Sequence, residues 1–101
     1  LHDALPIFDE RILKILSKED LDKIQNLNIL IVGVGGVGGY ALEALARTGI
    51  KNITIIDKDK IDESNLNRQI IALNNNINNS KVEEAQKRVL SIRKTIHLEK
   101  F

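Results

Sequence analysis

Apolar residues along the chain change between two spacings, and this change separates predicted strands from predicted helices. The continuous apolar runs Asn28–Val32 and Asn52–Ile56 are rich in β-branched residues and are typical of parallel strands buried on both faces. Between them the apolar residues take helical spacing up to Gly49, a residue type that commonly ends helices. We expect this helix to begin near Gly36 to Gly38. Its expected buried positions are Ala41, Leu42 and Leu45.

Helical spacing also marks the residues that precede the first strand. Ser17, followed three residues later by Asp20, predicts the N-terminal cap of a helix with Leu21 and Ile24 on its buried side. Before it, a shorter helix is expected from a single apolar face, which consists of Ile12, Ile15 and Leu16.

The C-terminal third of the chain changes from helix to strand once more. Ser80 and Glu83 have the spacing of a capping box, in which each side chain bonds the backbone of the other residue. Thr95–Phe101 is expected to form a third strand. Strands that alternate with helices predict an α/β fold, a Rossmann-like doubly wound and mainly parallel sheet preceded by short N-terminal helices. The helical stripe of this third consists of Val82, Ala85, Val89 and Ile92.

The first residues do not continue this pattern. Leu1–Ile7 resembles the translated read-through of a common sequencing adapter, so we exclude it from the fold and expect no packed contacts there. One domain, residues 8–101, is left, without an internal repeat or linker. The run Asn74–Asn76 is interpreted as compositional bias.

Composition narrows the class of protein without giving a function. With 43% hydrophobic and 29% charged residues, the chain is typical of a folded globular protein. Its net charge of +1 gives no overall attraction to nucleic acid or to anionic membranes, although a local basic patch stays open. Cysteine is absent, which excludes disulfides and a cysteine nucleophile in these residues. No apolar run approaches the length of a membrane span, and we expect a cytoplasmic protein.

A glycine-rich turn joins the first strand to the following helix. Gly33 permits a tight exit from the strand, Gly35 lets the backbone approach a phosphate, and Gly38 lets the helix pack close to the sheet. The free N–H groups at the helix start attract an anion. Asp57 ends the second strand, where a carboxylate accepts hydrogen bonds from ribose hydroxyls. We expect a nucleotide site, although close packing alone also explains such glycines, and the turn does not separate ATP from NAD.

The residues after Asp57 make the sequence recognisable. Beyond the glycine turn and Asp57, they include Asn65, Arg68, Gln69 and Lys81. In their order and spacing, these motifs resemble those of the ubiquitin-activating-enzyme-like (HesA/MoeB/ThiF) adenylyltransferase superfamily. The resemblance covers roughly Phe8 to Ile92. Glu43–Ile50 and Asn67–Leu73 are most similar to its branch of tRNA threonylcarbamoyladenosine dehydratases.

The resemblance implies an ATP-dependent enzyme that adenylylates a carboxylate, here the threonylcarbamoyl group on an adenosine of tRNA, which then closes into a ring. Arg68 and Lys81 would stabilise the phosphoryl charge as the catalytic residues, and no protein nucleophile is needed. Arg11 matches an arginine that in relatives reaches the partner subunit's site, which implies a homodimer. Mg²⁺ would accompany ATP. The candidate nucleotide-binding residues are Gly33, Gly35, Gly36, Gly38, Asp57, Asp59, Asn65 and Gln69.

Several positions depart from the family pattern. Asn78 stands where a glycine is usual, although asparagine also tolerates a left-handed conformation. Ile71 replaces a histidine, Ser17 a glycine, and Ile92–Lys94 an Ile-Asn-Pro sequence. Family members are at least twice as long, and their metal-binding aspartate follows a later strand. We therefore expect a chain of this length to bind nucleotide weakly and not to turn over.

Three alternatives stay open. A related enzyme would activate the C-terminus of a ubiquitin-like sulfur-carrier protein in the thiamine or molybdopterin pathway. An NAD-dependent oxidoreductase would also use Asp57 on a ribose, but it leaves Asn65, Arg68 and Lys81 without a role. A non-catalytic nucleotide-binding or scaffolding domain would bind nucleotide without releasing pyrophosphate.

Overall fold

The structure is a computed structural model that describes residues 7–101. Its helices are α1 (Lys18–Gln25), α2 (Gly36–Thr48) and α3 (Lys81–Ile92), and its strands are β1 (Asn28–Val32), β2 (Asn52–Ile56) and β3 (His97–Lys100). Short 3₁₀ turns are η1 (Ile7–Asp9), η2 (Ile12–Lys14), η3 (Glu63–Asn65) and η4 (Asn74–Asn76). The expectation about the leader Leu1–Ile7 falls, apart from Ile7, on residues outside the described range.

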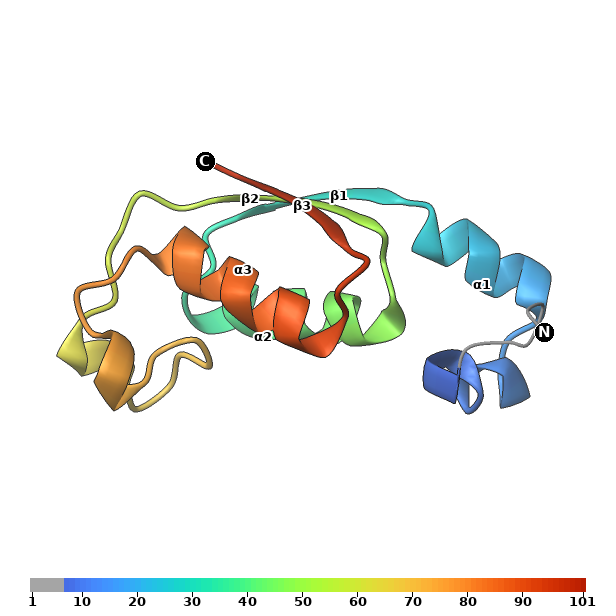
Figure 1. Ribbon diagram of the computed structural model, residues 1–101, viewed down its shortest axis with the longest axis horizontal. Coiled ribbons are helices and arrows are strands. Elements are labelled where there is room, and N and C mark those ends of the chain that lie inside the picture. The colour runs from blue at the N-terminus through green and yellow to red at the C-terminus, as the bar shows by residue number, and fades with distance from the viewer. Residues whose placement is uncertain (1–6) are drawn as a thin grey trace.

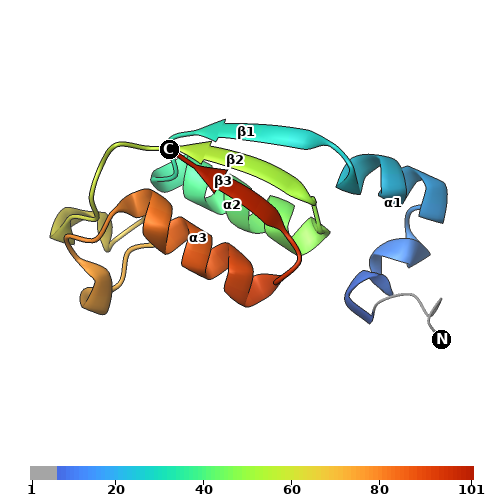
Figure 2. The same cartoon turned by 45° about the horizontal axis from the view of Figure 1, so that its top comes forward.

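The strands form one parallel sheet in the order β1-β2-β3. Ile29 of β1 pairs with Ile53 of β2, which in turn pairs with Leu98 of β3. Helices α2 and α3 connect successive strands and lie together on one face of the sheet (Figures 1 and 2). The predicted α/β class and the parallel sheet are thereby confirmed. The core between the sheet and these helices includes Leu42, Ala46, Ile53, Ile55, Ala85 and Val89.

The second face of the sheet is open in the described residues. Along β1, Ile29 and Ile31 are half-buried and pack against the core, whereas Leu30 is 59% and Val32 is 74% exposed. The prediction of strands buried on both faces is therefore wrong for β1. The reason is that α2 and α3 both cover the same face (Figure 2), so every second side chain of the strand meets solvent.

Helix α2 begins and ends where the sequence predicts. It starts at Gly36 and is closed by Gly49, whose φ of 88° is the left-handed C-cap conformation. Leu42 is buried as expected, but Ala41 is exposed and Ala46 is buried in its place. The buried face of α2 runs through positions 39, 42 and 46, and Ala41 projects to its side.

The other helix starts match the sequence less evenly. The Ser17 side chain accepts a hydrogen bond from the Asp20 amide and caps α1, as predicted. The segment before it forms only the short turn η2, and Ile15 is 85% exposed, so the predicted apolar face is wrong there. Helix α3 does begin after Ser80, but Ser80 makes no side-chain cap bond. Glu83 instead pairs with Lys100, at 3.6 Å, so the predicted capping box is absent.

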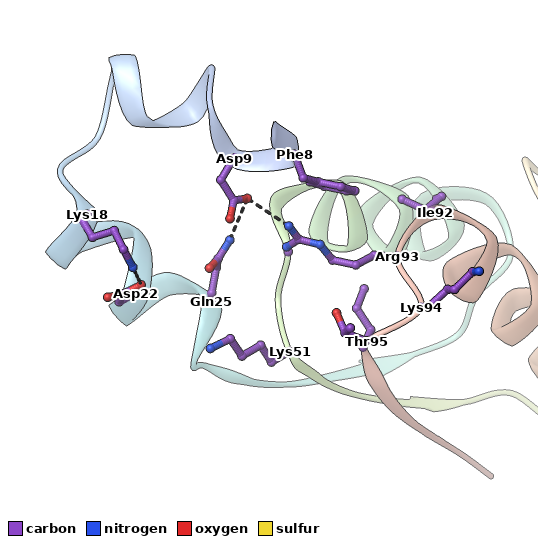
Figure 3. A pocket seen from close by; sticks show the side chains of 12 residues that line it. Phe8, Asp9, Lys18, Asp22, Gln25, Lys51, Ile92, Arg93, Lys94 and Thr95 are labelled. Carbon is purple, nitrogen blue, oxygen red and sulfur yellow. Dashed lines mark hydrogen bonds and ion pairs between the residues drawn. The ribbon is translucent and has the colours of Figure 1, made fainter. Parts of the chain in front are cut away.

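The N-terminal segment is anchored by a buried ion pair at the amino ends of the strands. Asp9 Oδ1 lies 3.2 Å from Arg93 Nη2 and accepts a hydrogen bond from Gln25 Nε2 at 3.2 Å (Figure 3). The Arg93 guanidinium lies 3.7 Å from the centre of the Phe8 ring, a cation–π contact. These side chains line an open cavity of about 600 Å³. The anchored segment projects from one end of the molecule and the loop that contains η3 and η4 from the other (Figure 1). The radius of gyration is accordingly 14.8 Å, above the roughly 13 Å of a compact domain of this size.

None of the helices in residues 7–101 is both long and apolar enough to cross a bilayer.

Gly49→Ala tests how this end of the molecule is held together. A Cβ at position 49 would collide with Arg93 Nη1 and lie 2.6 Å from Gln25 Nε2, on a backbone that already has a left-handed φ. We expect the free energy of unfolding to fall by at least about 1–2 kcal/mol, the cost of the left-handed conformation alone. Gly36→Ala is the matched control, because a Cβ there meets nothing within 4 Å. Urea unfolding of both variants checks this, and equal stability would contradict it.

Candidate nucleotide-binding site

The glycine turn after β1 is shaped by two close backbone approaches. Gly33 has a φ of 88°, a conformation that favours glycine, and its amide donates to the Ile56 carbonyl at 2.7 Å. A Cβ on Gly38 would collide with the Gly33 carbonyl oxygen, so only glycine lets the first turn of α2 pack against the turn that precedes it. The α2 N-terminus is thereby held at the carboxyl end of β1, where its free amides can meet an anion.

Asp57 fastens this turn to the end of β2. Its Oδ2 accepts a hydrogen bond from the Val34 amide at 2.9 Å, and its Oδ1 accepts one from the Asp59 amide at 2.8 Å. From the sequence we predicted that Asp57 binds ribose hydroxyls, but not that both of its carboxylate oxygens accept hydrogen bonds from backbone amides. A carboxylate has about four acceptor positions, so capacity for ribose hydroxyls is left.

Backbone pairing across the loop after β2 brings Lys81 to the same end of the sheet. The Lys81 amide donates to the Asp59 carbonyl at 3.0 Å, and the Asn78 amide donates to the Ile61 carbonyl at 2.7 Å. Asn78 has a φ of 74°, so it does adopt the left-handed conformation for which glycine is usual in the family. The Lys81 residue is only 7% exposed. The start of α3 is therefore joined to the segment that leaves β2.

Side-chain hydrogen bonds around η3 shape the middle of the loop between β2 and α3. Asn65 is buried, and its Oδ1 accepts from the Asp62 amide at 2.8 Å, while the Asp62 carboxylate accepts from the Ser64 amide at 2.9 Å. Hydrogen bonds from Ser64 hold the pKa of Asp62 below its usual range, and the positive charge of Lys81 adds to this effect. In this structure Asn65 shapes the loop that carries the cations.

Arg68 lies beside the N-terminus of α2. It is exposed, and its Nη1 donates to the Ser64 carbonyl and to Asn67 Oδ1, both at 3.0 Å. With Gly36 it lines a shallow, largely apolar hollow of about 610 Å³. The rest of this hollow consists of Val37, Tyr40 and Ala41. The Arg68 side chain therefore lies next to the helix end at which an anion is expected, while its guanidinium is bonded to its own loop.

Gln69 is buried against the glycine turn. A Cβ on Gly35 would lie 3.1 Å from Gln69 Nε2, so the absence of a side chain at position 35 makes room for this amide. The structure thus joins the glycine turn to Asp57 and Gln69, and Asp57 to Asp59. It places Arg68 beside Gly36, joins Lys81 to Asp59 through the backbone, and uses Asn65 to cap the loop between them.

Arg11 does not join this group within one chain. It is exposed and directly precedes η2. The N-terminal segment that carries it lies beyond the amino ends of the strands, whereas the glycine turn follows their carboxyl ends (Figure 2). Any role of Arg11 at the site therefore requires a second molecule.

Two features of the site region escaped the sequence analysis. Asn76, within a run interpreted as compositional, is buried, and its Nδ2 donates to the Ile71 carbonyl at 2.8 Å and to Glu84 Oε1 at 3.0 Å. Val37 and Tyr40 line the hollow beside Arg68. The available signal was the outer face of α2, where apolar residues recur at helical spacing.

Metal-ligating side chains do not gather at this site. Residues 7–101 contain no group of three or more His, Cys, Asp or Glu side chains placed to hold a metal ion. Asp57 uses both oxygens on backbone amides, and Asp59 is exposed. These residues do not form a metal site of their own.

Comparison with known proteins places this geometry in a family. The family model described as "ThiF family" matches residues 8–101. The chain belongs to the ThiF family. A tRNA threonylcarbamoyladenosine dehydratase of Bacillus subtilis is 42% identical over 77 residues, which are 76% of this chain and 30% of that protein. A probable molybdopterin-synthase adenylyltransferase of Porphyra purpurea is 42% identical over 90 residues, 89% of this chain and 24% of that protein.

Solved structures extend the likeness to the fold. The crystal structure of the E. coli tRNA N6-threonylcarbamoyladenosine dehydratase matches with a TM-score of 0.92 and 36% identity, over 98% of this chain and 41% of that one. The same enzyme in complex with ATP matches with a TM-score of 0.87 and 37% identity, over 91% of this chain and 38% of that one. The chain thus spans less than half the length of these relatives.

Asp57→Asn tests whether the carboxylate locks the turn. An amide keeps one acceptor and turns an NH₂ group toward either the Val34 or the Asp59 amide, so one of those donors loses its partner. We expect the free energy of unfolding to fall by about 1–3 kcal/mol. The control is Asp59→Asn, since Asp59 is exposed and only its backbone takes part in these bonds, and its effect should stay within about 0.5 kcal/mol. Urea unfolding of both variants checks this. If Asp57→Asn and Asp59→Asn lower the free energy of unfolding equally, the Asp57 carboxylate does not fix the turn.

Proposed function

We propose that the full-length protein uses ATP to adenylylate a carboxylate. The observation that carries this proposal is that the start of α3 with Lys81 is bonded through its backbone to the segment after Asp57, while Arg68 lies beside Gly36, at the end of the sheet where a phosphate would meet the α2 amides. Support also comes from the ATP complex of the E. coli relative. An NAD-dependent oxidoreductase receives no support from the ThiF family match.

The chemistry needs cations rather than a protein nucleophile. A carboxylate oxygen attacks the α-phosphorus of ATP, the bond from that phosphorus to the bridging oxygen breaks, and pyrophosphate leaves with the electron pair. Two anions approach each other in this step, and negative charge develops on the phosphoryl oxygens. Positive groups held in place before the reaction therefore supply most of the rate enhancement.

The cationic side chains of the proposed site differ in their exposure and in the contacts they can make. Arg68 is exposed and uses Nη1 on the loop backbone, so its remaining N–H groups are available for a forked contact to phosphate oxygens. Lys81 is largely buried at the start of α3 and acts as a point charge. Arg11 would be supplied by the second molecule of a homodimer, since its own chain carries it at the other end of the sheet.

For the substrate we propose the threonylcarbamoyl group on an adenosine of tRNA. The names of the Bacillus subtilis and E. coli relatives support this choice. Once the carboxylate is adenylylated, a nucleophilic atom of the same modification attacks its carbonyl carbon, the bond to AMP breaks, the nucleophile loses its proton, and the ring closes. The sum of the two steps is an ATP-driven dehydration.

A ubiquitin-like sulfur carrier is the second candidate substrate. The Porphyra purpurea relative is as similar in identity as the Bacillus subtilis one, and its name assigns it to molybdopterin-synthase adenylylation. The same adenylylation step would act on the C-terminal carboxylate of that carrier protein. The charge arrangement around Arg68 and Lys81 suits either carboxylate.

ATP binds to enzymes together with a divalent cation. We propose that Mg²⁺ enters with ATP as the counter-ion of its phosphates. We propose a cytoplasmic location, where ATP and tRNA are available.

Arg68→Ala should slow adenylylation strongly, because it removes one charge contact that is in place before the reaction. We expect the rate of ATP–pyrophosphate exchange by the full-length protein to fall about 10²- to 10³-fold, and Lys81→Ala to act in the same direction. Arg47→Ala is the matched control, an exposed arginine that pairs with Glu43 on the last turn of α2. Exchange that survives Arg68→Ala unchanged would remove this residue from the mechanism.

The two candidate substrates make opposite predictions in one assay. With tRNA that carries threonylcarbamoyladenosine, pyrophosphate release should depend on the modified tRNA and stop when the modification is absent. A sulfur-carrier protein that ends in a free carboxylate should give no pyrophosphate above background. Stimulation by the carrier protein alone would reverse the choice of substrate and leave the adenylylation chemistry standing.

A further inference from the structure

Gln69 is buried beside the glycine turn with a polar atom that nothing in the described chain uses. The residue is 8% exposed. Within residues 7–101, its Oε1 is buried and has no hydrogen-bond partner. Burying an unpaired acceptor is unfavourable, so hydrogen bonding by Oε1 is not what keeps this side chain in place.

The whole amide group of Gln69 rests on Gly35. A Cβ at position 35 would lie 3.1 Å from Nε2, 3.3 Å from Cδ and 3.4 Å from Oε1. Three similar distances mean that the amide lies across the Cα of Gly35 and does not point one atom at it. The contact is therefore a packing contact between the loop and the turn.

The backbone of Gln69 is fixed on both sides. Its backbone amide donates to the Asn65 carbonyl at 2.9 Å, and its backbone carbonyl accepts from the Ala72 amide at 3.0 Å. Arg68 is the preceding residue, and its Nη1 donates to the Ser64 carbonyl. A change in how Gln69 sits on Gly35 would therefore move Arg68 relative to the start of α2.

We infer that Gln69 is a positioning residue, a buried spacer that sets the distance between the glycine turn and Arg68. This inference rests on the proposed function and differs from the expected role of Gln69 as a nucleotide ligand, in which Nε2 would donate to a phosphate oxygen. The free Oε1 is an acceptor, so a phosphate oxygen does not pair with it. In the spacer role the site uses the volume and length of the side chain and not its amide chemistry.

The test compares Gln69→Ala with Gln69→Met in ATP–pyrophosphate exchange by the full-length protein. Alanine removes the spacer and lets Arg68 shift, so kcat should fall about tenfold to a hundredfold while the KM for ATP changes little. Methionine restores an unbranched chain of similar length without an amide and should recover most of the lost kcat. Its melting temperature should equal or exceed that of the wild type, because the unpaired acceptor is gone.

Gln25→Met is the matched control for the same substitution at another buried glutamine. Gln25 Nε2 donates to Asp9 Oδ1 at 3.2 Å and to the Thr48 carbonyl at 3.0 Å, at the far end of the sheet. This variant should lose thermal stability because two bonds disappear, with no change in the ratio of kcat to KM. The two methionine variants therefore separate loss of stability from loss of positioning.

The possible results distinguish the inference from the function beneath it. If Gln69→Met is as slow as Gln69→Ala and raises the KM for ATP, the amide is a ligand and the spacer role is wrong, while the proposed function stands. If the wild-type protein binds no ATP, both fail. Recovery of kcat by methionine, together with an unchanged KM in all Gln69 variants, supports the spacer.

Discussion

The arrangement of the candidate site depends on the contact between the Asp57 carboxylate and the Val34 amide. β1 and β2 are already parallel neighbours, but their carboxyl ends lead into separate loops. The bond at 2.9 Å fixes the β1–α2 turn to the end of β2, and the second oxygen fixes the first residues of the loop that follows. One side chain therefore ties together the helix start that attracts an anion and the segment that brings the cations. Because glycine at position 38 lets α2 reach the turn, this lock also fixes the helix axis relative to the sheet.

From that lock the loop after β2 is built by backbone hydrogen bonds and asparagine caps instead of regular structure. The pairing of residues 59–61 with residues 78–81 delivers Lys81, and the Asn65 cap shapes the turn before Arg68. Buried amide side chains suit this task because each can satisfy several backbone groups that a loop leaves unpaired. Asn76 does the same for the second half of the loop through the Leu73 amide and the Ile71 carbonyl. Ile61, Ile71 and Ala72 join this loop to the core, so the cations stand on a framework held by both polar and apolar contacts.

Features decided by neighbouring residues were predictable from the sequence, and features decided by tertiary packing were not. The cap at Ser17, the left-handed end at Gly49 and the glycine-rich start of α2 each follow from a few consecutive residues. Ala41 was expected to be buried on periodicity alone, but the position of the sheet turns the buried face of α2 toward Ala46. The Ser80 and Glu83 box is absent: Ser80 makes no cap bond, and Glu83 pairs with Lys100, which is distant in sequence.

The same distinction holds for the site residues. Asp57, Arg68 and Lys81 belong to a recognisable spacing, so a shared site could be predicted for them, but the backbone bonds that place their segments could not. Gln69 belongs to that spacing too, yet its burial on Gly35 depends on how the loop returns to the turn, which no local pattern encodes.

The amino ends of the strands hold the N-terminal segment, and the carboxyl ends carry the candidate site. This separation decides how Arg11 could reach the site. At the amino ends, Asp9 and Arg93 form a pair with little exposure, and the Phe8 ring stacks on the guanidinium, so the segment that carries Arg11 is attached to the body of the chain. Breaking one partner of such a pair leaves a buried charge, which makes the attachment costly to undo. A segment held in this way cannot swing along the length of the strands to the glycine turn of its own chain. If Arg11 contributes to adenylylation, the contribution must come from another molecule whose amino end faces this carboxyl end.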